Sequence, residues 1–153
     1  MSVRQIVKSQ YQKRVNEAAK SVRDITVPKE GWSRTVRKAL GMSGAQLGRR
    51  MGISRAAISN TEKAEPAGGV TLKNMQQLAE AMGCRFVYAI VPEGNIEDVI
   101  EQQARKKAAK IVNKTNKNMA LEAQGLSNEQ VEYELERLKQ QFIKESPSDL
   151  WND

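Results

Sequence analysis

The chain has no histidine and only one cysteine among its 153 residues. A single cysteine excludes a disulfide within the chain, and the usual zinc clusters need several cysteine or histidine ligands. Without histidine, and with the cysteine set in an apolar run, no pairing of a nucleophile with a base is apparent. No glycine-rich phosphate loop follows a predicted strand. We therefore expect no enzymatic activity, no metal and no cofactor.

Aromatic residues are also scarce, at 5%, whereas charged residues make up 28% of the chain. The core must therefore be mainly aliphatic, which suits helices, and no long series rich in Val, Thr and Tyr predicts a sandwich or a barrel. The sequence has no apolar run of about 18 residues that could span a membrane. Its first residues lack the apolar centre of a signal peptide. We expect a mainly α protein in the reducing cytoplasm.

The net charge of +7 is unevenly distributed along the chain. Residues 1–63 contain 14 Lys and Arg against 4 Asp and Glu, a net +10. Residues 64–153 contain 11 against 14, a net −3. Basic surfaces bind the phosphate backbone through counterion release, without reading sequence. The excess of positive charge in the first part favours nucleic acid as the partner.

Within that basic part, two short helices are predicted to meet at a tight turn. Ser43 can cap the first helix and Ser54 the second, while Gly52 accepts the left-handed backbone that ends the first. This is the spacing of a helix-turn-helix, whose second helix lies in the major groove of DNA. An ordinary helical hairpin has the same bare pattern, but the charges around the turn favour DNA binding. The cations there are Arg49, Arg50, Arg55 and Lys63, and Glu62 alone opposes them.

The motif lies within a helical domain predicted at residues 31–83. The first helix of this domain is expected at residues 32–40. Its apolar spacing turns Trp32 and Leu40 inward and leaves Arg37 facing solvent.

Residues 1–28 are predicted to form a basic amphipathic helix that precedes this domain. Its apolar residues recur at steps of three and four from residue 3 to residue 25. We expect this stripe to pack on the same chain or on a second copy. The basic face could also contact phosphates beside the DNA site.

Residues 84–92 form the one run with the composition of a β-strand. An isolated strand leaves its backbone donors and acceptors unpaired, which is costly. Pairing with the same strand of a second subunit across a two-fold axis would satisfy them. We therefore predict a homodimer, with Cys84 as a small buried residue. The predicted dimerisation residues are Phe86, Val87, Tyr88 and Ile90.

Residues 95–153 are predicted to form a C-terminal helical region. A long helix is expected to begin at Asn95 and to end at Gly125. Ser127 then caps a last helix, with Gln130 as its capping-box partner. The apolar stripe of this last helix consists of Val131, Leu135, Leu138 and Phe142.

The end of the chain is acidic. Residues 118–153 contain 3 basic and 8 acidic residues, a net −5. This charge suits a basic protein surface better than DNA. Trp151, near the end, either docks onto the chain's own helices or enters a pocket of a partner.

Six short motifs follow one another along nearly the whole chain. They are Gly31-Trp32, residues 37–42, Glu62-Lys63, residues 90–92, residues 119–124 and Leu150-Trp151. Together they resemble the mobile mystery protein A family. The resemblance implies a helix-turn-helix of the phage-repressor (Xre/Cro) class, encoded beside a Fic-domain protein in an arrangement similar to a toxin–antitoxin pair. The segment that leads into the predicted strand also resembles antitoxins of the HipB type, whose single strand pairs across a dimer.

The resemblance to the phage-repressor class also implies roles for individual residues. Phosphate contacts would come from Ser43, Ser54 and Lys63, and the charge of Arg49 adds it to this set. Base contacts would come from Arg55, Ala56, Ser59 and Asn60.

One departure from that class concerns the start of the two motif helices. Many members have glutamine at the first position of the first motif helix, where it contacts phosphate and braces a base-reading glutamine. Gly44 and Arg55 occupy these two positions here. Arg55 can donate two hydrogen bonds to O6 and N7 of guanine, so we expect a G·C pair in each half-site.

The sequence thus predicts a dimeric, sequence-specific repressor of its own operon, bound to an inverted-repeat operator. An antitoxin that neutralises the Fic partner by direct contact is the alternative, and a DNA binder without sequence preference is a third possibility. Fic enzymes are inhibited by a helical motif whose letters match residues 26–31. Pro28 opposes a continuous helix there.

Overall fold

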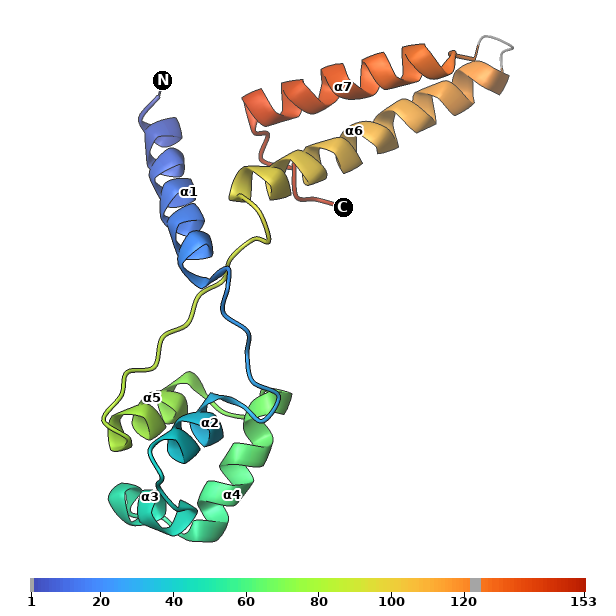
Figure 1. Ribbon diagram of the computed structural model, residues 1–153. Coiled ribbons are helices and arrows are strands. Elements are labelled where there is room, and N and C mark those ends of the chain that lie inside the picture. Colours follow the sequence, from blue (N-terminus) through green and yellow to red (C-terminus); the bar gives the residue numbers. More distant parts are fainter. Residues whose placement is uncertain (1, 122–124) are drawn as a thin grey trace. The chain divides into compact units, whose positions relative to one another are not determined.

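The computed structural model describes residues 2–121 and 125–153, and its regular elements are helices (Figure 1). The predicted mainly α fold is therefore confirmed. The helices are α1 (Val3–Val22), α2 (Trp32–Ala39), α3 (Gly44–Met51), α4 (Arg55–Ala64), the 3₁₀ helix η1 (Glu65–Ala67), α5 (Leu72–Ala81), α6 (Ile96–Leu121) and α7 (Asn128–Glu145). No helix in the described ranges is long and apolar enough to cross a bilayer.

The chain separates into two compact units. One comprises residues 24–89, and the other joins the N-terminal part up to Arg23 with residues 90–153. The four segments expected from the sequence stay a prediction, but α1 belongs to the same unit as the C-terminal helices.

In the unit of residues 24–89, helices α2 to α5 surround a small aliphatic core. Leu47 of α3, Ile58 of α4 and Leu78 of α5 are at most 1% exposed. Met75 and Met82 complete this cluster. Burial of each large aliphatic side chain contributes about 1.5–3 kcal/mol. Because the buried side chains come from α3, α4 and α5, one shared set of contacts holds these three helices together.

A buried ion pair joins α2 to α4. Nε of Arg37 lies 2.5 Å from Oε1 of Glu62, and its Nη2 donates to Oε2 at 3.0 Å. Nη1 of Arg37 also donates to the carbonyl of Met42 at 2.9 Å. The hydrogen bond to Glu62 raises the pKa of the Arg37 guanidinium. The expectation that Arg37 faces solvent is wrong, because this side chain neutralises a carboxylate that α4 buries.

A second carboxylate closes the N-terminus of α2. The cap residue, Gly31, has no side chain, so the first amides of the helix need another acceptor. Glu65 of η1 accepts hydrogen bonds from the amides of Trp32 and Ser33 and from the Ser33 hydroxyl. A Cβ on Gly31 would lie 2.7 Å from Oε2 of Glu65. Glycine therefore lets this carboxylate reach the helix end.

The ends of α2 depart from the expected packing. Trp32 and Leu40 were expected to face inward but are 39% and 51% exposed. Only Val36, which lies on the same face between them, packs against the core cluster. A helix of two turns touches a small core at its middle, and its ends lie at the rim.

Residues 84–92 run extended, without strand pairing within the described part of the chain. The single-strand prediction is therefore not supported in this chain. Phe86 packs against the core cluster, but Val87, Tyr88 and Ile90 are 66%, 65% and 94% exposed. Cys84 is also exposed, so its predicted burial is wrong. Without a partner strand among the described residues, most apolar side chains of this run stay open to solvent.

The other unit contains an antiparallel hairpin of α6 and α7 (Figure 1). Ser127 and Gln130 form the predicted capping box at the start of α7. The predicted end of the long helix at Gly125 and the last part of the motif at residues 119–124 involve residues 122–124, which lie outside the described ranges. The expected apolar stripe of α7 is confirmed, because it packs against α6 at Ala108 and Val112.

The C-terminal tail is anchored by Leu150, which is 2% exposed. Nε2 of Gln103 donates to the Leu150 carbonyl at 2.8 Å, and Nζ of Lys107 is 2.9 Å from Oδ1 of Asp149. Trp151 remains 56% exposed. The residue that docks onto the chain's own helices is therefore Leu150 rather than Trp151.

Helix α1 forms as predicted, but its apolar stripe is covered only in part. Asn16 accepts from the amide of Ile96 at 2.8 Å and so caps the start of α6. Ala19 is the one buried residue of α1, whereas Val3 and Tyr11 are 78% and 70% exposed. The first half of the stripe stays exposed within this chain.

Residues 26–31, which match the Fic-inhibitory letters, do not form a helix. Glu30 instead faces Lys38, whose hydrogen bond lowers the pKa of the Glu30 carboxyl. The conformation does not support an inhibitory helix at this place.

Replacing Arg37 tests the role of the buried ion pair. Arg37→Leu leaves the Glu62 carboxylate, which is 7% exposed, without its partner. We expect a loss of about 3 kcal/mol in the free energy of unfolding. Urea unfolding should be measured in a Trp151→Phe background, so that Trp32 reports on this unit alone.

The matched control is Lys38→Leu, because the adjacent Lys38 forms an exposed pair with Glu30. Its midpoint should stay close to that of the parent chain. Equal losses for the two variants would contradict the special role of Arg37.

Candidate nucleic-acid interface

Three local features build the turn between α3 and α4. Ser43 caps α3 by accepting from the amide of Gln46 at 3.1 Å, and the Gln46 side chain accepts in return from the Ser43 amide. Gly52 ends α3 with φ of 72°. Ser54 caps α4 by accepting from the amide of Ala57 at 3.0 Å. The two serine caps and the end of α3 at Gly52 that the sequence predicts are confirmed.

Gly48 is a further requirement of this turn that sequence reasoning missed. A Cβ at Gly48 would lie 2.6 Å from the carbonyl oxygen of Ile53 and 3.3 Å from the carbonyl carbon of Ser54. The backbone that leads into α4 therefore passes directly over Gly48 of α3. The signal available in the sequence was a glycine placed four residues before Gly52, the residue that ends α3.

Helix α4 has one buried and one open side. Ile58 and Glu62, four residues apart, face the core and the ion pair with Arg37. Beside this buried strip, the rest of the α4 surface carries residues at helical steps of one, three and four, which lie within one continuous arc of the helix. These residues are Arg55, Ala56, Ser59, Asn60 and Lys63, of which Ser59 is half-buried and the others exposed. The structure thus brings the sequence-predicted base-reading residues onto one face.

The residues expected to contact phosphate lie around this face. Ser43 and Ser54 use their oxygens as helix caps, but each hydroxyl can still donate its proton to another acceptor. Arg49 is exposed near the end of α3, and Lys63 is exposed near the end of α4. Arg50 differs, because its Nε donates to the Ala81 carbonyl at 2.7 Å and so caps the end of α5.

The buried ion pair changes the electrostatics of this surface. Glu62 was expected to oppose the cations of the turn, but its carboxylate binds Arg37 instead. Among the described residues, Arg49, Arg55 and Lys63 have no carboxylate within 4 Å. The positive charge of the open face is therefore not neutralised by the neighbouring described side chains.

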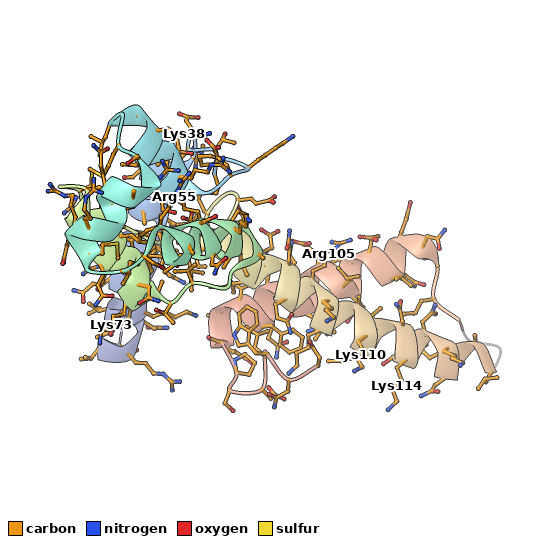
Figure 2. The ribbon with its side chains drawn as sticks, turned by 90° about the horizontal axis from the view of Figure 1, so that it is seen from below. Lys38, Arg55, Lys73, Arg105, Lys110 and Lys114 are labelled. Atoms are coloured by element: carbon orange, nitrogen blue, oxygen red, sulfur yellow. The ribbon has the colours of Figure 1, made fainter. Side chains whose placement is uncertain are left out.

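Gly44 lies beside the stem of Arg55. A Cβ at Gly44 would be 3.8 Å from Cγ of Arg55, an ordinary contact distance. The two positions that carry glutamines in many phage-repressor proteins are thus neighbours here too, and only one of them has a side chain. Arg55 (labelled in Figure 2) has no support from that side.

In the part of the chain that the structure describes, no three His, Cys, Asp or Glu side chains are placed to hold a metal ion. The chemistry of the α4 face is that of hydrogen-bond donors and positive charge.

The family comparison agrees with this geometry. Residues 34–88 match the model of the helix-turn-helix family. These residues are an Xre-type helix-turn-helix domain. The domain indicates a DNA-binding transcription regulator. Comparison of the chain with curated proteins and with solved structures gave no match.

Gly48→Ala tests the close approach inside the helix-turn-helix. The added methyl group must displace the backbone of residues 53 and 54, and we expect a loss of about 1–3 kcal/mol in the free energy of unfolding. Chemical denaturation followed by Trp32 fluorescence would measure it.

Gly44→Ala is the matched control, since its Cβ has room and lies in the first turn of the same helix. Alanine should leave stability unchanged or raise it by up to about 1 kcal/mol. A Gly48→Ala chain as stable as Gly44→Ala would show that the turn does not need glycine there.

Proposed function

We propose that this protein is a dimeric, sequence-specific DNA-binding repressor of its own operon. The observation that carries the proposal is the open face of α4. There, side chains short enough to admit a DNA base edge stand beside an arginine whose charge is not neutralised nearby. A recognition helix in the major groove needs such a face.

Arg55 is the residue proposed to read a base. It occupies the first position of α4, and recognition helices contact base edges with their N-terminal residues. Its guanidinium can bind O6 and N7 of guanine with two hydrogen bonds. Ala56 and Ser59 leave space for the approach, and Asn60 can pair with adenine.

The residues around α4 are proposed to hold the phosphate backbone. Ser43 and Ser54 donate hydroxyl protons, while Arg49 and Lys63 contribute charge. These contacts fix the register of α4 in the groove but carry no sequence information.

Arg55→Ala should therefore reduce specificity as well as affinity. We expect the variant to lose about 1–3 kcal/mol of binding to the operator and to relax the preference at one G·C pair in each half-site. Binding should be compared on the operator, on operators with each base pair changed, and on random duplex.

Arg49→Ala is the control, because the loss of a phosphate contact weakens binding to every sequence alike and lowers the salt dependence. Equal losses for Arg55→Ala on operator and random DNA would refute its base-reading role.

Dimerisation is proposed to depend on residues 84–92. The described chain leaves Val87, Tyr88 and Ile90 exposed and supplies no strand beside them. The same run from a second copy could pair with it and cover these side chains. The exposed apolar stripe of α1 offers further surface to a second copy.

Ile90→Lys should shift the chain toward monomer, since a lysine on an exposed strand edge opposes edge pairing. Sedimentation equilibrium of the free protein measures this shift. Lys29→Ile, which changes an exposed residue outside the run, should leave the association unchanged. A wild-type chain that remains monomeric at high concentration would refute the dimer.

A second candidate function is that of an antitoxin that neutralises a Fic-type partner by direct contact. The exposure of Trp151 favours it, because aromatic side chains are enriched at protein interfaces. The neighbouring Fic gene is implied only by the resemblance to the mobile mystery protein A family. Co-purification of the two proteins without DNA, with and without Trp151→Ala, discriminates this candidate from a repressor that acts only on DNA.

A further inference from the structure

Helix α6 carries a row of lysines on the side opposite its buried residues. Lys110, Lys114 and Lys117 are exposed and follow one another at steps of four and three, so they lie along one side of the helix. The buried residues Ala108 and Val112 face α7 from the other side. Figure 2 shows Lys110 and Lys114 projecting from the same side of α6. We call these three residues the α6 lysine row.

The other cations of α6 are paired with acids of the same unit. Arg105 lies 3.8 Å from Glu132, and Lys106 lies 3.3 Å from Asp153. Lys107 binds Asp149 in the tail. Acidic residues of the tail and of α7 thus form ion pairs with the cations in the first half of α6.

The α6 lysine row differs in this respect. Within residues 2–121 and 125–153, no carboxylate lies within 4 Å of its three ammonium groups. Asp153 is near enough to be influenced by Lys110. Its pKa is lowered by hydrogen bonds from Gln103 and Lys106 and also by the charge of Lys110. Between residues 102 and 121, α6 itself contains six Lys and Arg and no Asp or Glu.

Helix stability does not explain the row. Like charges four residues apart, such as Lys110 and Lys114, destabilise an isolated helix. Cations stabilise the last turn of a helix through its dipole, but the last turn of α6 has no basic residue. The row therefore costs helix stability, and binding of an anion would relieve that cost.

We infer that the α6 lysine row binds the phosphate backbone of the DNA to which the helix-turn-helix domain binds. The inference rests on the proposed DNA-binding function. From Lys110 to Lys117 the row extends about 10 Å along a straight helix, which suits a continuous polyanion better than scattered surface carboxylates. Because both units belong to one chain, binding through α4 raises the concentration of DNA phosphates around the row.

The contact would add affinity without adding sequence preference. The chain would then hold DNA with two surfaces of different kinds. The α4 face would select the site, and the α6 lysine row would lengthen the occupancy of any site selected.

The test replaces the three lysines by glutamine in the full chain. Binding is measured by fluorescence anisotropy between about 50 and 200 mM salt, on the operator duplex and on a random duplex of the same length. Each lost phosphate contact lowers the slope of log K against log salt by about 0.9, so the slope should fall by up to about 2.7 per bound chain. The loss should be the same on both duplexes, and the triple Lys→Arg variant should retain the wild-type slope.

The matched control removes the same charge from elsewhere in the unit, by Lys106→Gln, Arg137→Gln and Lys144→Gln. These exposed cations lie outside the row, and Lys106 and Arg137 are each paired with an acid, so the slope of this control should change much less. Equal changes for the row and control variants, or an unchanged slope for the row variant, would overturn the inference and leave the function of α4 intact.

Two other results have separate meanings. If the wild-type chain binds operator and random duplex equally, the proposed sequence-specific function fails. If the row variant changes the sedimentation of the chain without DNA, the row binds a protein surface, such as the acidic α7 of a second copy, and the inference is overturned. Circular dichroism should show undiminished helix content in the row variant.

Discussion

The buried pair between Arg37 and Glu62 is the constraint on which the proposed DNA-binding surface depends. Glu62 is buried near the end of α4, and Arg55 is exposed at its first residue. By holding Glu62, Arg37 fixes the rotation of α4 about its axis and also ties the segment before α3 through the Met42 carbonyl. A small aliphatic core alone would allow helices to slide, whereas a bidentate pair has one geometry. The pair also engages Glu62, the one acidic residue of the motif, so that its carboxylate does not neutralise the cations around the turn.

Some cations of the chain are therefore engaged in structural contacts and others are not, a difference that composition cannot reveal. Arg37, Arg50 and Lys139 are engaged in structural contacts, with a buried acid, a helix end and the acids of the α6–α7 hairpin respectively. The α4 face and the α6 lysine row have no such engagement among the described residues. Positive charge that is unpaired and gathered on one face favours phosphate binding. The net charge of +7 does not show where such faces lie.

The sequence allowed prediction of those features that depend on neighbouring residues. Ser43, Ser54 and Ser127 are caps because the residues that follow them form helices, and the stripe of α7 follows from its spacing. Features that depend on distant partners were missed or misjudged. Arg37 meets a glutamate 25 residues away, and Glu65 reaches the start of α2 over 32 residues. Gly48 is crowded by the backbone that leads into the next helix. Residues 84–92 have the composition of a strand, but composition does not supply the second strand that a ladder requires.

We propose that α4 reads a specific DNA sequence in the context of a dimer. Footprinting of the DNA upstream of the chain's own gene tests it most directly, because protection reports binding, symmetry and spacing together. We expect one protected inverted repeat whose half-sites lie about 34–36 Å apart, roughly one helical turn, each with a G·C pair that Arg55 requires. Uniform weak protection, or protection of a single asymmetric site, would contradict it.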